Sequence, residues 1–265
     1  MSTSGSGSDA APLVSLRGVT KSFGAVQALG GVDVDIPIGE VTALVGDNGA
    51  GKSSLVKTIS GLWEPDRGEI RWRGAPVRLR SPKEAEALGI TTIYQDLALC
   101  DNLDIVQNMF LGHEGMRHGT LDEDSMEIRA RDTLKELSVT TIRSIRQPVA
   151  SLSGGQRQSV AVAKAVMSNA QLVIMDEPTA ALGVAQTAMV LGLIERLAAR
   201  GVTVLMISHN LNDVFEVADR IAILRLGRMV TEGPAASFDT QVIVDFMTTG
   251  TSSRVSVNGG AGHEA

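Results

Sequence analysis

Short apolar runs alternate with longer amphipathic stretches along this chain. Leu172–Met175 and Val202–Ile207 have the pattern of buried strands, and Ala185–Arg200 between them has the apolar spacing of an amphipathic helix. A strand, a crossover helix and a second strand form the repeating unit of a parallel sheet. The pattern therefore predicts an α/β fold with a mostly parallel sheet.

Other segments predict an antiparallel β part and a helical insertion. Leu13–Val19 and Val32–Ile36 alternate apolar and polar residues like half-exposed antiparallel strands, and Arg220–Leu226 and Arg228–Glu232 form a hairpin around Gly227. Strand signals fade from Asp96 to Ala150, where helical patterns dominate. Further expected strands are Val41–Val45, Glu69–Trp72 and Ile90–Tyr94, and further helices are Lys52–Leu62, Asn102–Leu111, Asp124–Leu137 and Gln156–Met167.

The pattern of expected helices and strands also predicts the domain organisation. We expect one domain over residues 13–248, with a helical subdomain at about 96–165 and no internal repeat. Residues 1–12 and 249–265 are rich in Ser, Gly and Thr, so we expect disordered tails there.

Composition narrows the class of protein. The net charge is −6, which gives no global basic field for nucleic acid. One cysteine among 265 residues excludes an internal disulfide and fits a reducing cytosol. The N-terminus has no secretory signal pattern, and no apolar run approaches the roughly 20 residues that span a bilayer. We expect any membrane role to come through a partner.

A glycine-rich loop carries the strongest chemical signal. Its pattern G-x-x-x-x-G-K-S lies between an expected strand and an expected helix. Backbone N–H groups of such a loop face phosphates, the lysine neutralises their charge, and the serine hydroxyl holds Mg²⁺. The alternative is a glycine-rich turn with an incidental lysine. The predicted ATP-binding residues are Gly46, Asp47, Asn48, Gly49, Ala50, Gly51, Lys52, Ser53 and Ser54.

Two adjacent carboxylates end the buried strand Leu172–Met175. A buried strand directs its last polar residue into the crevice at the carboxyl edge of the sheet. We expect Asp176 to hold Mg²⁺ and Glu177 to polarise the attacking water. A solvated Asp-Glu turn before a proline is the alternative, which the phosphate loop makes the weaker one.

The segment Leu152–Gln156 precedes an expected helix, and its residues fit two interpretations, one structural and one functional. Ser153 and Gln156 have the spacing of a capping box, which is a routine helix start. The same helix start also suits an anion, and Gly154 and Gly155 would let a phosphate approach closely. Both readings can hold.

Three further residues are candidates for the same crevice. His209 and Gln95 each follow an expected strand, where His209 would contact the γ-phosphate and Gln95 the Mg²⁺ or the water. Phe23 precedes the loop and could stack on adenine, although a lone Phe is as often part of a core. A histidine after a strand is, taken alone, more often only a loop residue.

In this order the motifs resemble the ABC ATPase family. Phe23 stands at the adenine-stacking aromatic, Gly46–Ser53 at the phosphate loop and Gln95 at the Q-loop. Leu152–Gln156 reads LSGGQ, the family signature, Asp176 and Glu177 end its Mg²⁺ strand, and His209 is its switch histidine. The resemblance implies a homodimer that binds ATP and Mg²⁺, with Ser153 and Gly155 completing the site of the partner copy.

The amino-acid sequences of three segments, 46–54, 94–112 and 175–186, are similar to those of sugar importers of the ribose, xylose and fructose type. This resemblance implies an ATPase at the cytoplasmic face of the cell membrane, bound to permease subunits and served by an extracytoplasmic sugar-binding protein. One position departs from the wider family, because Gly183 stands where most members have an aspartate that links the two sites. Glycine loosens the backbone there, although the similar sugar-import sequences share it.

Two other functions remain to be weighed against transport. A soluble ABC ATPase acting on ribosomes or DNA would usually have twin cassettes or long coiled-coil insertions and a basic surface, which this acidic chain lacks. A regulator that binds ATP without hydrolysing it is the third reading, and replacement of Glu177 would separate it from an ATPase.

Overall fold

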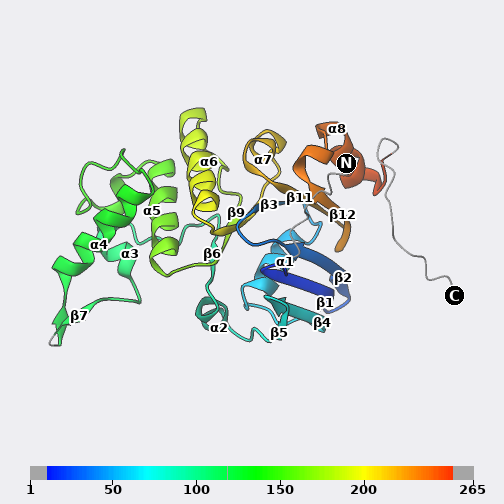
Figure 1. The fold of residues 1–265 in the computed structure, drawn as a ribbon, viewed down its shortest axis with the longest axis horizontal. Helices are drawn as coiled ribbons and strands as arrows, with labels where there is room; N and C mark the ends of the chain where they lie inside the picture. The colour runs from blue at the N-terminus through cyan, green and yellow to red at the C-terminus, as the bar shows by residue number, and fades with distance from the viewer. Residues whose placement is uncertain (1–10, 118, 253–265) are drawn as a thin grey trace, which may run out of the picture.

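The computed structural model describes residues 11–117 and 119–252. The predicted α/β architecture is confirmed, because a six-stranded sheet lies between a layer of helices and a smaller antiparallel sheet (Figure 1). The strand order is β12-β11-β3-β10-β9-β6, and every neighbouring pair is parallel except β11 with β12. The strands are β3 (Val41–Val45), β6 (Ile90–Ile93), β9 (Leu172–Asp176), β10 (Thr203–Ile207), β11 (Arg220–Arg225) and β12 (Arg228–Pro234).

The antiparallel sheet has the order β2-β1-β4-β5. Its first hairpin is longer than predicted, since the strands pair from Val14 with Ile36 to Phe23 with Val26. Register shifts interrupt the pairing after Leu16, so the alternation of apolar and polar residues is clear only toward one end of each strand. The strands are β1 (Val14–Phe23), β2 (Val26–Ile36), β4 (Arg67–Trp72) and β5 (Ala75–Val77).

Alternate residues of the central sheet face two separate hydrophobic clusters. In β9, Val173 and Met175 join one cluster, whereas Leu172 and Ile174 join the other. The first cluster contains residues of α3 to α8, and the second contains α1 and the antiparallel sheet. The helices are α1 (Lys52–Ile59), α2 (Pro82–Ala87), α3 (Ile105–Phe110), α4 (Glu123–Glu136), α5 (Gly154–Met167), α6 (Val184–Ala199), α7 (Leu211–Val217) and α8 (Thr240–Thr249).

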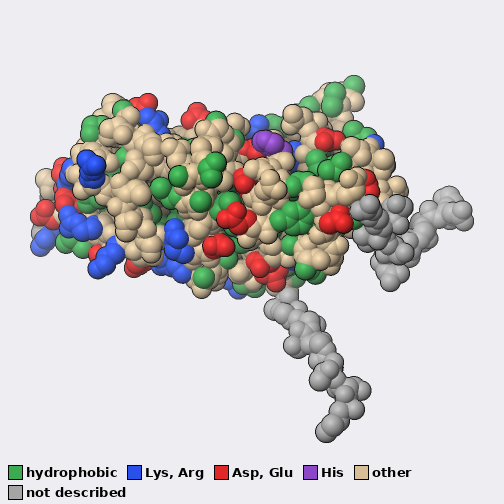
Figure 2. All heavy atoms as spheres, turned by 90° about the horizontal axis from the view of Figure 1, so that it is seen from above, with side chains coloured by type: hydrophobic (Ala, Val, Ile, Leu, Met, Phe, Trp, Pro, Cys, Tyr) green, Lys and Arg blue, Asp and Glu red, His purple; other side chains and the backbone are tan. Residues whose placement is uncertain are grey.

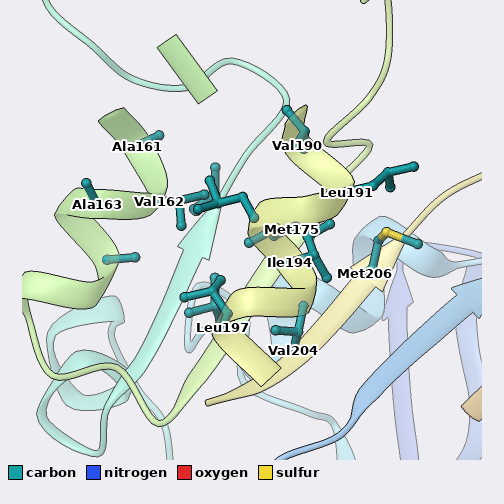
Figure 3. Packing of buried hydrophobic residues seen from close by; sticks show 14 of the residues in the cluster. Ala161, Val162, Ala163, Met175, Val190, Leu191, Ile194, Leu197, Val204 and Met206 are labelled. Atoms are coloured by element: carbon teal, nitrogen blue, oxygen red, sulfur yellow. The ribbon is translucent and has the colours of Figure 1, made fainter. Parts of the chain in front are cut away.

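Helix α6 packs against both α5 and the sheet. Figure 3 shows its residues Ile194 and Leu197 beside Val162 of α5 and above Val204 of β10. All four side chains are buried. Burying one aliphatic side chain of this size contributes about 1.5–3 kcal/mol, so this layer holds the strand ends in place.

The segment between β6 and β9 forms the elongated end of the molecule. Helices α3 and α4 pack against α5 there (Figure 1), and Figure 2 shows Lys and Arg side chains gathered at the same end. A small hairpin of β7 (Met116–Arg117) and β8 (Thr120–Leu121) also lies in this segment. It was not predicted, because strands of two residues are too short to show a period.

Three short helices, α2, α7 and α8, were likewise not predicted. The tail predicted from residue 249 is wrong at its first residue, because α8 ends at Thr249, where Gly250 with φ of 84° terminates it. Most of both predicted tails, 1–10 and 253–265, lies outside the described residues. None of the helices in the described ranges has the length and apolar character needed to span a bilayer.

Candidate nucleotide site

A cleft of about 480 Å³ lies at the carboxyl ends of β3, β9 and β10. It brings together the phosphate loop, Gln95, Asp176, Glu177 and His209, which the sequence places far apart. Parallel strands explain this, because their carboxyl ends meet at one edge of the sheet. The cleft is lined by Val26, Gln27, Ala28, Asp47, Asn48, Gly49, Ala50, Gly51, Lys52, Ser53, Ser54, Gln95, Asp176, Glu177, Ala180, Ile207 and His209.

The phosphate loop is glycine-dependent at two positions. Gly46 has φ of 157°, and a Cβ there would lie 2.2 Å from the carbonyl oxygen of Leu224. Gly51 has φ of 106°, and a Cβ there would lie 2.7 Å from the carbonyl oxygen of Ala28. Strands β2 and β11 therefore press against the loop so closely that no side chain fits at either glycine.

Helix α1 begins at the loop without a side-chain cap. Its N-cap is Gly51, and no side chain accepts a hydrogen bond from the first turn. The N–H groups of that turn have no partner within the helix, and the helix dipole adds positive potential at this point. The arrangement suits the phosphate groups of a nucleotide.

Lys52 is buried beneath the loop. Its Nζ donates hydrogen bonds to the carbonyl oxygens of Gly46, at 2.5 Å, and Asp47, at 3.0 Å. Burial lowers the pKa of Lys52, while the negative charges of Glu177, Asp47 and Asp176 act in the opposite direction. The ammonium group is therefore placed among carboxylates and is set to neutralise anionic oxygens in the cleft.

Two carboxylates and a histidine face the loop. Asp176 is the last residue of β9, and burial, with the neighbouring charge of Glu177 as the second cause, raises its pKa. Glu177 has φ of 51°, an uncommon backbone conformation for a non-glycine residue. Its Oε2 lies 2.8 Å from Nδ1 of His209, whose side chain is 68% exposed.

The segment Ser153–Gln156 lies away from this cleft, since none of its four residues lines it. Its capping box is present: Gln156 N–H donates to Ser153 Oγ, and Ser153 N–H donates to Gln156 Oε1. Gly154 and Gly155 also lie close to other parts of their own chain. A Cβ on Gly154 would lie 2.7 Å from Leu182 Cδ2, and one on Gly155 would lie 3.1 Å from Gln186 Cβ, so packing within the chain already favours both glycines.

Phe23 also lies outside the residues that line the cleft. Its ring packs edge to face on Trp63 with 4.5 Å between centroids, and the residue is 41% exposed. Instead, Val26, Gln27 and Ala28 of β2 reach the cleft, which the sequence did not indicate because contacts between β2 and the loop are not local. Stacking of Phe23 on adenine stays a prediction.

A family model described as ABC transporter matches residues 29–180, which is more than half of the chain. This chain belongs to the ABC transporter family. The match contains the phosphate loop, Gln95, the LSGGQ segment, Asp176 and Glu177. The protein is thus an ATP-binding cassette and an ATPase of this family, as the sequence predicted.

Curated relatives of this cassette are named for sugar import. The fructose import ATP-binding protein FrcA of Rhizobium meliloti is 50% identical, with 89% of this chain and 94% of the relative covered. The xylose/arabinose import ATP-binding protein XylG of Sulfolobus acidocaldarius is 46% identical at the same coverage. The ribose import ATP-binding protein RbsA 1 of Rubrobacter xylanophilus is 45% identical, but the match spans only 44% of that longer protein.

Solved ATP-binding cassettes share the fold. The cassette MJ1267 of an ABC transporter is 25% identical, with a TM-score of 0.79 and coverage of 89% of this chain and 96% of that one. The bacterial cassette MJ0796, solved as a dimer, is 26% identical, with a TM-score of 0.70 and coverage of 85% and 100%. A related structure of MJ0796 is described as dimeric and bound to ADP and phosphate.

Proposed function

We propose that this cassette hydrolyses ATP to drive the import of a monosaccharide through a membrane permease. The similarity to FrcA and XylG over nearly their whole length supports the sugar assignment. The observation that carries the catalytic part is the cleft itself, in which a phosphate loop, two carboxylates, a glutamine and a histidine converge.

The residues present fit ATP with a divalent cation. The loop N–H groups and Lys52 would bind the phosphates, and Ser53, Gln95 and Asp176 supply the oxygen ligands that Mg²⁺ prefers. The raised pKa of Asp176 also fits, because a nearby cation would favour its charged form. When bound, Mg²⁺ would neutralise the charge that develops on the β- and γ-phosphates.

Glu177 and His209 would act on the attacking water. The 2.8 Å contact between Glu177 Oε2 and His209 Nδ1 holds the carboxylate in one orientation beside the phosphate loop. A carboxylate held this way can accept the proton of the water as it attacks the γ-phosphate. His209 is exposed to the cleft and would contact the γ-phosphate oxygens.

The LSGGQ segment would serve a second copy. Ser153, Gly154, Gly155 and Gln156 do not line the cleft of their own chain, so a contact with nucleotide requires another cassette. The dimeric structure of MJ0796 supports a homodimer in which each signature completes the partner's site. Phe23 would then pack beside the adenine at the edge of the cleft.

The relatives named for sugar import support a proposal for the remaining partners. We place the dimer at the cytoplasmic face of the cell membrane on two permease subunits, which an extracytoplasmic sugar-binding protein supplies. The Gln95 loop and the helical segment at about 96–165 would form the surface that contacts the permease. CbiO1 of Clostridium perfringens, 25% identical, is described as part of a transporter complex, which supports this assembly.

Replacement of Glu177 by Gln tests the catalytic assignment. We expect ATP turnover to fall about 100- to 10,000-fold, because the general base is lost while the side-chain volume is kept. Steady-state phosphate release and ATP affinity measure the two effects, and affinity should stay within about twofold. Glu195→Gln on the exposed face of α6 is the matched control and should have no effect. Unchanged turnover in E177Q would show that the assignment is wrong.

A further inference from the structure

A buried hydrogen bond joins the two segments that carry Glu177 and His209. Thr179 Oγ1 donates to Asp213 Oδ2 at 2.6 Å. Thr179 is 9% exposed and Asp213 is 6% exposed. A short hydrogen bond between a hydroxyl and a carboxylate therefore joins two buried side chains.

Each partner is close in sequence to one of the proposed groups. Thr179 follows Glu177 by two residues, and Asp213 lies in the first turn of α7, four residues after His209. On the other side of the pair, the Glu177 N–H donates to the carbonyl oxygen of Ile207 at 3.0 Å. Two hydrogen bonds, one on each side of the contact between Glu177 and His209, therefore join the segment that carries Glu177 to the segment that carries His209.

We propose that Thr179 and Asp213 are positioning residues that hold Glu177 and His209 in register for ATP hydrolysis. This inference rests on the proposed function, in which these two groups act on the water and the γ-phosphate. Neither Thr179 nor Asp213 lines the cleft, so both act through the groups they hold.

The two positioned groups need such support. His209 is 68% exposed at its side chain, so packing does little to fix its ring. Glu177 has φ of 51° and Ala181 has φ of 59°, so the turn between them begins and ends in a backbone conformation that persists only when its surroundings hold it. Thr179 lies in the middle of this turn, and its hydroxyl fixes the turn to α7.

Three threonine variants separate positioning from general stability. We expect Thr179→Val to lower kcat about 10- to 100-fold through misplacement of the reacting groups, with KM for ATP within about twofold. Thr179→Ser keeps the hydroxyl and should restore most of kcat. Thr203→Val is the matched control, because Thr203 is also a buried threonine and accepts a hydrogen bond from the Gly39 N–H, at the other end of β10. It should lower stability and leave kcat unchanged.

The imidazole of His209 gives a readout that does not depend on turnover. The chain has four histidines, so ¹⁵N-histidine labelling with His209→Gln for assignment isolates its ring signals. We expect T179V to shift the Nδ1 resonance that reports the contact with Glu177, and T179S and T203V to leave it in place. An unmoved resonance in T179V together with normal kcat would overturn the proposal.

A double variant covers the case in which T179V does not fold. Thr179→Val with Asp213→Leu removes both polar groups, which leaves no buried carboxylate without a partner and is often close to neutral for stability. We expect it to fold and still show the low kcat and the shifted resonance. Recovery of normal kcat in this variant would show that the pair only stabilises the fold.

Failure of this inference is distinct from failure of the proposed function. If E177Q turns over ATP normally, the catalytic assignment is wrong whatever T179V does. If E177Q is inactive while T179V keeps normal kcat and an unchanged His209 signal, the catalytic assignment stands and the positioning role is wrong.

Discussion

Single residues in the cleft show a conflict between stability and function. Asp176 and Glu177 are adjacent carboxylates, and Lys52 is buried close to both. Burial raises the pKa of Asp176 and lowers that of Lys52, so the charged form of each is disfavoured in the folded chain. Such an arrangement is typical of sites that bind a charged ligand, because the ligand's charge offsets the cost of burying these ionised side chains.

Replacement of Asp176 by Asn should stabilise the fold at neutral pH. Because the pKa of Asp176 is raised in the folded chain, its cost to stability is absent below the unfolded value of 3.8, grows as the pH rises from there, and is complete above the folded pKa. We therefore expect a gain in the free energy of unfolding at neutral pH that shrinks toward pH 4, with loss of Mg²⁺-dependent turnover. Denaturant unfolding over this pH range measures it, and Asp132→Asn on the exposed face of α4 is the control. A gain independent of pH would contradict the explanation.

Among the elements, the start of α6 contains Gly183, the position that departs from most of the family. Gly183 is the N-cap of α6 with φ of −75° and ψ of 161°, a conformation that any residue adopts. A Cβ there would meet no atom within 4 Å, and no side chain caps the helix. Glycine at this position is therefore not required by the backbone, and the absent carboxylate is its main consequence within the monomer.

Replacement of Gly183 by Asp should stabilise α6 modestly. Aspartate accepts a hydrogen bond from the first turn, and it improves on a glycine N-cap by a few tenths of a kcal/mol, about 0.3–0.5. Thermal unfolding of the monomer measures the change. Gly183→Ala is the matched control, because alanine is a poor N-cap and should be no better than glycine. Equal stabilisation by Asp and Ala would show that capping is not the cause.

Across the whole molecule, the phosphate loop and the LSGGQ segment lie at separate places. Lys52 is beneath the cleft, whereas Ser153 caps α5 and does not line that cleft. One chain thus presents two half-sites, and a two-fold dimer would pair each half with its complement. Under the proposed function, hydrolysis would be a property of the dimer.

Mixing two inactive variants should therefore restore activity. Lys52→Ala removes phosphate binding, and Ser153→Arg blocks the signature while leaving its own loop intact. Random pairing in an equal mixture gives half heterodimers, each with one intact composite site, so we expect up to about a quarter of the normal turnover per chain. Phosphate release measures it, and S153R mixed with the double variant K52A/S153R is the control without any intact site. No recovery in the first mixture would contradict action in trans.

The sequence by itself determined the alternating α/β order, the glycine-rich loop, the capping box at Ser153 and the carboxylates at the end of β9. These features are local, since a helix start, a turn or a strand end is specified by residues within a few positions of one another. The parallel sheet then placed Gln95, Asp176, Glu177 and His209 at one edge, which was foreseeable because each of them ends or follows an expected strand.

Only the tertiary structure decided which residues touch across the chain. It placed Phe23 on Trp63, packed Gly154 against Leu182, and joined Thr179 to Asp213. The two residues of each pair are between 28 and 40 positions apart in the sequence. The spacing of apolar residues predicts which face of an element is buried, but it does not predict which residues of other elements contact that face. Contacts of this kind arise from close packing of whole elements, so their identity appears only once the layers are in place.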